Sequence, residues 1–267
     1  MDPCNRREVF MKLVIVPDQD TACAHVADML YMCCARNPAA VLGLATGRTM
    51  ERVYGHLVRR IHDRPVNLAG CTTFNLDEYC GPVARTAQSY RAYMQHHLFR
   101  HLDIPPTRTH LPPGDTDDVT AACARYETAI RAAGGIDLQL LGIGHTGHIG
   151  FNEPLSSFAS RTRRVRLAPA TRVQNAEMFG DCPDDVPQHA LTVGVGTILE
   201  TRRAVLLATG PGKAAIVTRV IEGAISAMTS ASALHFHPDC TFVLDEDAAM
   251  DLSDECRWMA DYLPPRH

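Results

Sequence analysis

The sequence lacks three features that would place it in large functional classes. No apolar run approaches the roughly 20 residues that a membrane-spanning helix needs, and no signal-peptide core follows residues 1–8. There is no basic excess either, because 26 Lys and Arg face 30 Asp and Glu, for a formal charge of -4. Proteins that bind nucleic acid in general are usually basic. We therefore expect a cytoplasmic protein that binds neither membranes nor nucleic acid.

The ten cysteines form no C-x-x-C pair and show no repeated spacing. Several lie within apolar segments, which favours buried free thiols in a reducing compartment over disulfides. No zinc-site spacing is present: His145 and His148 lack a third ligand, and His235 and His237 lie in an apolar stretch. We predict that the protein uses no metal.

The composition is that of an ordinary globular chain, with 46% apolar and 21% charged residues in 267. It contains no internal repeat or low-complexity segment, so we expect a single domain over residues 1–267. Short apolar runs alternate with longer amphipathic stretches. This alternation predicts an α/β fold, namely a doubly wound, mostly parallel, Rossmann-like sheet with helices on both faces. The expected strands are 12–16, 41–44, 72–76, 138–143, 205–208 and 241–244. The expected helices are 21–36 (capped by Asp20), 50–61, 89–102, 117–133 and one that starts at Lys213.

Glycine-rich turns follow two of these strands, and ligands bind such sheets at the carboxyl ends of the strands. The turn at 45–49 opens a helix, so its free N–H groups and the helix dipole suit a phosphate. Its spacing is neither that of a P-loop nor GxGxxG, and a glycine required for tight packing is the alternative. The turn at 209–213 sets Lys213 at a helix start, where the dipole disfavours a cation unless an anionic ligand is present.

Acidic and imidazole side chains follow two further strands. Asp77 and Glu78 are adjacent and should point in opposite directions, so one can enter a cleft and act as a base. A helix cap or a structural ion pair is the alternative for these two acids. The glycine-rich segment 142–154 contains His148 and Glu153, and a carboxylate that orients an imidazole is a common arrangement for proton transfer.

Taken together, these segments resemble the glucosamine-6-phosphate deaminase (glucosamine/galactosamine-6-phosphate isomerase) family. The resemblance runs from about residue 12 to 249 and includes, in family order, segments 43–47, 74–79, 147–154, 160–163, 190–197 and 213–214. It implies a homo-oligomer without an organic cofactor. The implied reaction converts glucosamine 6-phosphate to fructose 6-phosphate and ammonia. Alternatives are another or an unphosphorylated amino sugar, a sugar lactone, or a sugar-phosphate sensor without turnover.

The resemblance also implies roles for individual residues. Asp77 matches the base that moves a proton between C2 and C1, His148 matches the group that opens the sugar ring, and Glu153 matches its carboxylate partner. The matches to phosphate-binding positions are Gly47, Arg48, Thr49 and Lys213.

The chain departs from the family pattern at two of these places. Thr146 stands where the family usually has an Asp of the ring-opening relay, so we expect slower opening of a cyclic substrate. Glu177 stands where an arginine usually clamps the phosphate, and a carboxylate there would repel a dianion. We hypothesise that Arg48 supplies the missing charge; the alternatives are a substrate without a phosphate and a Glu177 on a mobile segment that points elsewhere. Ser156 and Arg163 fit the family's allosteric site, but Val165 replaces a common lysine there, so activation by an acetylated sugar phosphate is not expected.

Overall fold

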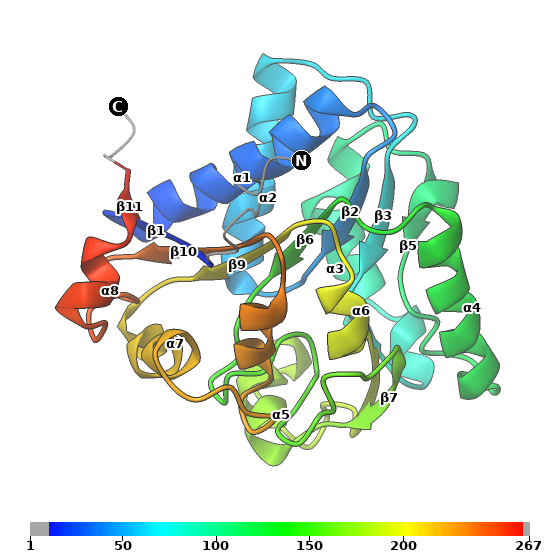
Figure 1. Ribbon diagram of the computed structural model, residues 1–267. Coiled ribbons are helices and arrows are strands. Elements are labelled where there is room, and N and C mark those ends of the chain that lie inside the picture. The colour runs from blue at the N-terminus through cyan, green and yellow to red at the C-terminus, as the bar shows by residue number, and fades with distance from the viewer. Residues whose placement is uncertain (1–10, 264–267) are drawn as a thin grey trace, which may run out of the picture.

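A computed structural model describes residues 11–263, and the predicted α/β architecture is confirmed (Figure 1). Eight strands form one sheet in the order β11-β1-β10-β9-β6-β2-β3-β5, and every neighbouring pair is parallel. The strands are β1 (Lys12–Val16), β2 (Val41–Leu44), β3 (Thr72–Asn75), β5 (Thr109–His110), β6 (Leu138–Leu141), β9 (Ala204–Ala208), β10 (Cys240–Asp245) and β11 (Asp261–Tyr262).

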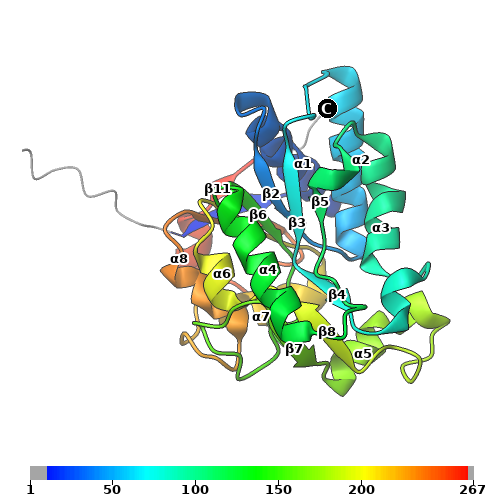
Figure 2. The ribbon, with the colours of Figure 1, turned by 90° about the vertical axis from the view of Figure 1, so that its right-hand side faces the viewer.

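Helices cover both faces of this sheet, as expected for a doubly wound fold. In Figure 2, α2 and α3 lie on one side of strands β2 and β3, and α4 and α6 lie on the other. The α-helices are α1 (Gln19–Arg36), α2 (Arg48–Asp63), α3 (Tyr90–His97), α4 (Val119–Ala132), α5 (Pro169–Asn175), α6 (Val195–Leu199), α7 (Ala214–Ile221) and α8 (Asp254–Trp258). The 3-10 helices are η1 (Pro82–Arg85), η2 (Phe99–His101), η3 (Pro106–Arg108), η4 (Ala176–Phe179), η5 (Pro211–Lys213) and η6 (Ser230–Phe236). Within residues 11–263, no helix combines the length and apolar character needed to cross a bilayer.

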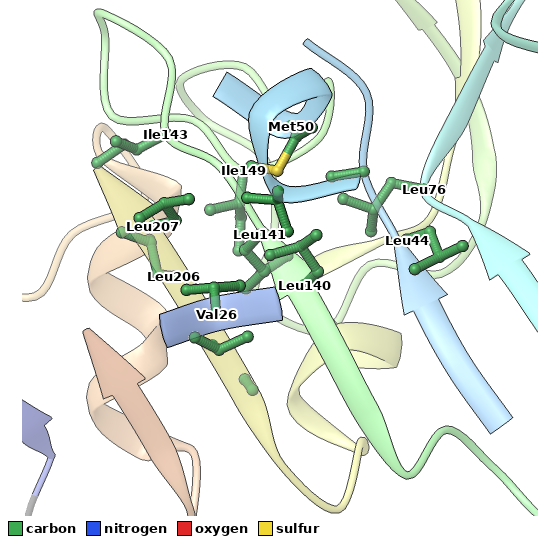
Figure 3. Close-up of a cluster of buried hydrophobic side chains, with 14 of the residues drawn as sticks. Val26, Leu44, Met50, Leu76, Leu140, Leu141, Ile143, Ile149, Leu206 and Leu207 are labelled. Carbon is green, nitrogen blue, oxygen red and sulfur yellow. The ribbon is translucent and has the colours of Figure 1, made fainter. Parts of the chain in front are cut away.

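The centre of the sheet is apolar on both sides, which explains why its strands read as continuous hydrophobic runs. β6 and β9 are completely buried. Figure 3 shows how helices from the covering layer meet these strands. The labelled side chains there include Leu140, Leu141, Leu206 and Leu207 from the strands, Val26 from α1 and Met50 from α2. This core fixes the strand ends from which the polar residues emerge.

A second, antiparallel sheet was not expected. It has three strands in the order β4-β8-β7: β4 (Asp77–Tyr79), β8 (His189–Thr192) and β7 (Arg163–Arg166). It pairs Asp77 with Thr192, and Thr192 with Arg163. The predicted strand 72–76 is therefore too long by one residue, because the chain leaves the large sheet after Asn75 and enters the small one at Asp77.

Two predicted helix boundaries are wrong for identifiable reasons. The cap of α1 is Asp18, whose carboxylate accepts a hydrogen bond from the Thr21 N–H at 2.8 Å, so the helix begins before Asp20. The helix expected over 89–102 ends at His97, and a separate 3-10 turn follows at Phe99–His101. All nine cysteines in the described range are unpaired, as predicted, and Cys4 and residues 1–8 lie outside that range.

The winding of the chain reverses between β2 and β6, which are neighbours in the large sheet. From β2 the chain moves outward through β3 to β5, whereas from β6 it moves the other way through β9 to β10. Such a switch point opens a crevice at the carboxyl ends of the strands. The segments that the sequence predicted as candidate sites lie at this crevice.

Candidate active site

A cavity of about 430 Å³ occupies the crevice at the switch point. Segments that follow β2, β3, β6 and β9 line it. The predicted residues that line it are Gly47, Arg48, Thr49, Asp77, His148 and Lys213. The remaining two, Thr146 and Glu153, contact His148 instead. The residues chosen from sequence therefore converge on one place.

Asp77 begins β4, and its side chain faces the cavity while remaining only 6% exposed. Burial, followed by the charge of Glu78, raises the pKa of Asp77 to about 8. Among the described residues, no donor hydrogen-bonds its carboxylate. A carboxyl group held in this way is poised to exchange a proton near neutral pH.

Glu78 points the opposite way, as the extended backbone predicts. Its carboxylate accepts hydrogen bonds from the N–H groups of Tyr90 and Arg91 at 3.0 and 2.9 Å, at the start of α3. The capping alternative is thus correct for Glu78, and the cleft-facing interpretation is correct for Asp77.

His148 lines the cavity, and its ring is held at Nδ1. Its Nδ1 is 2.9 Å from the Thr146 hydroxyl oxygen and 3.5 Å from Glu153 Oε2. Burial lowers the pKa of His148 more than Glu153 raises it, and Lys213 and His145 lower it further. The imidazole is therefore neutral near pH 7, with Nε2 left to exchange a proton when Nδ1 carries the hydrogen. Glycine is required at Gly144, because a Cβ there would lie 2.1 Å from Nε2 of this ring.

Glu153 is oriented by groups that the sequence did not reveal. Its Oε1 accepts hydrogen bonds from the Ala168 N–H at 3.1 Å and from the Thr171 hydroxyl at 2.6 Å. Its Oε2 is buried without a hydrogen bond and faces His148 Nδ1. An unsatisfied buried carboxylate oxygen is costly, and a proton gained by the imidazole would relieve it.

The two glycine-rich turns have the same local geometry. Gly47 precedes α2 with φ 127°, and Gly210 precedes η5 with φ 84°. Nothing lies within 4 Å of a Cβ built at either position, so the backbone conformation and not crowding requires glycine. In the described residues, no acceptor bonds the N–H groups of Arg48 and Thr49 at the start of α2, which leaves them available to an anion.

Lys213 brings the buried positive charge of the cavity. Its ammonium group donates a hydrogen bond to the Ile143 carbonyl at 2.8 Å. Burial and, to a smaller extent, Arg48 lower its pKa to about 8. The lysine therefore remains mostly charged at neutral pH and faces the same cavity as Asp77.

Arg48 and Glu177, the two unusual residues, form an ion pair with each other. Arg48 Nη1 lies 3.3 Å from Glu177 Oε2, and the side chains are 81% and 65% exposed. Exposed pairs of this kind contribute little to stability. The charge of the Glu177 carboxylate is thus matched by the neighbouring guanidinium.

Several cavity residues carry no signature in the sequence. Tyr90 from α3 and Gln174 and Asn175 from α5 line the cavity, and Asn175 donates a hydrogen bond to the Tyr79 hydroxyl at 3.1 Å. Gln19 reaches in from α1 and donates to the Thr209 hydroxyl at 2.9 Å. These residues come from helices, whereas strand ends guided the predictions.

The described part of the chain contains no group of three His, Cys, Asp or Glu side chains that could hold a metal ion. The fold and the cavity define a class: a doubly wound α/β protein whose switch point holds titratable side chains and a glycine turn with unbonded N–H groups in one cavity. The sequence model of one family, described as glucosamine-6-phosphate isomerases/6-phosphogluconolactonase, matches residues 19–242. The chain belongs to this family.

Individual relatives agree with this assignment. A glucosamine-6-phosphate deaminase of Rhodopirellula baltica is 50% identical over 90% of this chain and 95% of its own length. One of Shewanella loihica is 46% identical, over 92% and 91%. A solved structure described as a monomeric glucosamine-6-phosphate deaminase superposes with a TM-score of 0.88 at 43% identity and covers 90% of this chain and all of its own. A 6-phosphogluconolactonase from Trypanosoma cruzi shares the fold, with a TM-score of 0.73 at 19% identity over 92% of this chain and 98% of its own.

Proposed function

We propose that this protein is a glucosamine-6-phosphate deaminase, an enzyme that converts glucosamine 6-phosphate and water to fructose 6-phosphate and ammonia. The observation that carries the proposal is Asp77: a buried carboxyl group without hydrogen-bond partners in the described chain, facing a cavity that also holds Lys213. Neither a binding module nor a lactonase needs a base at that strand end. The names and high identities of the relatives support the same activity.

The reaction begins with opening of the sugar ring, which we assign to His148. Neutral at pH 7, its imidazole can take the proton from the O1 hydroxyl and deliver it to the ring oxygen as the C1–O5 bond breaks, which leaves an open-chain aldehyde. While the imidazole holds that proton, Glu153 faces a cationic ring at 3.5 Å, which satisfies its free oxygen. Thr146 offers the imidazole a hydrogen bond but no charge.

Isomerisation follows at C2, and we assign it to Asp77. The carboxylate removes the C2 proton, and the C–H bond electrons form the enolamine double bond between C2 and C1. The electrons of the aldehyde C=O bond move to O1, which takes a proton from the substrate's ammonium group. The same carboxyl group returns the proton to C1. Water then adds to the resulting imine at C2, and ammonia leaves as the ketone forms. The substrate's own ammonium group, close to Asp77, lowers the pKa of that carboxyl and favours the basic form.

The phosphate is assigned to the other end of the cavity. The N–H groups that follow Gly47, the Arg48 and Thr49 positions, and the Lys213 ammonium provide donors and positive charge. A bound phosphate holds the substrate at a fixed distance from Asp77, so the free energy of phosphate binding also positions C2.

A panel of sugars tests this function. Purified protein is incubated with glucosamine 6-phosphate, galactosamine 6-phosphate, free glucosamine and 6-phosphogluconolactone, and ammonia, ketose and acid release are measured. We expect ammonia and fructose 6-phosphate in equal amounts from the first substrate alone. Binding without ammonia release would indicate a sensor, and acid release from the lactone alone would indicate a lactonase.

We also propose that the protein is a single-domain homo-oligomer of the cytoplasm. Unpaired cysteines support a reducing compartment. An apolar patch supports self-association: Leu155, Met228 and Phe236 are 77%, 55% and 63% exposed, and Phe236 contacts Phe158. The related enzyme described as monomeric is the rival case. Sedimentation equilibrium decides between them, with Phe236→Glu expected to shift an oligomer toward the monomer.

A further inference from the structure

The anion end of the cavity holds less free positive charge than a phosphate dianion needs. Lys213 is fixed to the Ile143 carbonyl, and its pKa of about 8 means that it loses part of its charge as the pH rises. Arg48 is paired with Glu177 at 3.3 Å. Apart from these two, the basic side chains that line the cavity are His145 and His148, and His148 is tied to Thr146 and Glu153.

His145 lies where a third positive charge would be useful. It follows β6 in an exposed turn and lines both the main cavity and a shallower one beside it, which also contains Glu177 and Asp181. Arg48 and Gln174 are the other two residues that line both cavities. Within residues 11–263, His145 has no hydrogen bond or ion pair.

The surroundings of His145 are positive in the absence of substrate. Lys213 is the main cause of its lowered pKa, followed by burial and then Arg48. His145 also lowers the pKa of His148, so the two rings are within electrostatic range of each other. Three basic side chains from α2, the turn after β6 and η5 thus converge on one region.

We propose that His145 is a ligand of the substrate phosphate and takes up a proton when the phosphate binds. This inference rests on the proposed function, because it names a further residue of the same site. A dianion placed among these side chains reverses the sign of the local field, and the imidazolium becomes the favoured form. His145 then supplies the positive charge that Glu177 withdraws from Arg48.

The direction of the pH dependence follows. The groups that face His145 are Lys213, Arg48 and His148, with Glu177 and Asp181 across the second cavity. Below the pKa that His145 has in the complex, the ring is charged and the phosphate is held tightly. As the pH rises through that value, the charge is lost and affinity falls, before Lys213 loses its proton near pH 8.

Calorimetric binding of fructose 6-phosphate and of inorganic phosphate to the parent protein, His145→Asn and His145→Lys tests the proposal. His62→Asn, on the exposed end of α2, is the matched control. We expect His145→Asn to weaken binding at pH 6.5 by about tenfold, the effect of one charge-assisted hydrogen bond. We expect His145→Lys to retain tight binding with no decline between pH 6 and 7.5. Titration in buffers of different ionisation enthalpy should show proton uptake in the parent that is reduced in both His145 variants.

Binding by His145→Asn within twofold of the parent, with the same proton uptake, would overturn the proposal. A kinetic readout separates it from a structural role: KM for glucosamine 6-phosphate should rise in His145→Asn while kcat stays near the parent value. If the parent binds phosphate through His145 but releases no ammonia, the proposed function fails and this inference stands. If ammonia is released and KM is unchanged in the variant, the inference fails alone.

Discussion

The two ends of the cavity are built in different ways. Asp77 is 6% exposed and lies on a strand that pairs with β8, whereas Arg48 is 81% exposed and contacts a partner that is itself 65% exposed. Backbone hydrogen bonds and the core fix the position of the carboxylate, but surface side chains can move at little cost. Substitution of Asp77 should therefore lower the activity strongly, whereas substitutions at Arg48 and Glu177 should change it by smaller amounts.

Replacing the base should have the largest effect. We expect Asp77→Asn to lower kcat by about 10²–10⁴-fold, because the amide cannot accept the C2 proton. The assay is ammonia release at saturating substrate. Binding of fructose 6-phosphate should persist in the variant, since the phosphate end is unchanged. Substantial activity in this variant would contradict the assignment of Asp77.

The thermal stability of Asp77→Asn, measured at two pH values, tests whether the variant is folded and whether the parent carboxyl group is desolvated. Because burial raises the pKa of Asp77 from 3.8 to about 8, the folded state favours the protonated carboxyl group. The stability linked to that proton is present at low pH and is lost as the pH rises toward 8. Asn removes this dependence, so the gain in Tm over the parent should be larger at pH 9 than at pH 5. An equal difference at both pH values would mean that the carboxyl is not desolvated.

The pH profile of the parent should be a narrow bell. Asp77 must lose its proton to act as a base, so kcat/KM rises toward its pKa of about 8. Lys213 must keep its proton to hold phosphate, so kcat/KM falls above its own pKa of about 8. Each limb has a slope of about tenfold per pH unit away from the maximum. In Lys213→Arg, the alkaline limb should move to higher pH while the acid limb stays.

Substitutions in the Arg48–Glu177 ion pair should have smaller effects on KM, and the two residues should change KM in opposite directions. We expect Arg48→Ala to raise KM for glucosamine 6-phosphate by about five- to tenfold, the range of one hydrogen bond to a charged group. Binding of free glucosamine, which has no phosphate, should be unaffected. Glu177→Gln, the matched variant, should lower KM by about twofold, as expected from an exposed pair. An unchanged KM in Arg48→Ala would end the hypothesis that this arginine holds the phosphate.

The smallest effect is expected beside the imidazole. Thr146→Asp places a charge near His148 Nδ1, which raises the pKa of that ring and speeds proton transfer during ring opening. We expect kcat to increase about two- to fivefold, within the range that one partly buried charge can supply. The gain in kcat should vanish when ring opening is not rate-limiting. Stopped-flow measurements that start from pre-equilibrated open-chain substrate test this. A decrease in kcat would indicate that the hydroxyl already serves the relay.

The six inner strands of the large sheet were predictable because they are buried and read as apolar runs, whereas the edge strands β5 and β11, of two residues each, were not expected. The small sheet was not predictable. β7 has the sequence Arg-Arg-Val-Arg, which carries no apolar alternation, and its pairing with β8 depends on residues more than 20 positions away. The expected strand 72–76 failed at its end for the same reason, since Asp77 pairs with a segment that the local pattern does not show.

The candidate site residues could be predicted from the sequence where they lie in segments that follow strands. Asp77, His148 and Lys213 lie in the segments that come after β3, β6 and β9, so the fold class brings them to one edge of the sheet. Thr171 and Gln19 lie on helices, and their contacts with Glu153 and Thr209 depend on helix packing. The pairing of Arg48 with Glu177 joins residues from α2 and η4, and no local spacing encodes it.

Leu76 is the single residue between β3 and β4, and it is hydrogen-bonded on both sides. Its N–H donates to Leu44 in the large sheet at 3.0 Å, and its carbonyl accepts from Val193, next to β8, at 2.7 Å. Lys213 follows the large sheet, whereas Asp77 belongs to the small one. The separation between the proposed base and the proposed phosphate ligand therefore depends on the angle between the two sheets, which meet at Leu76.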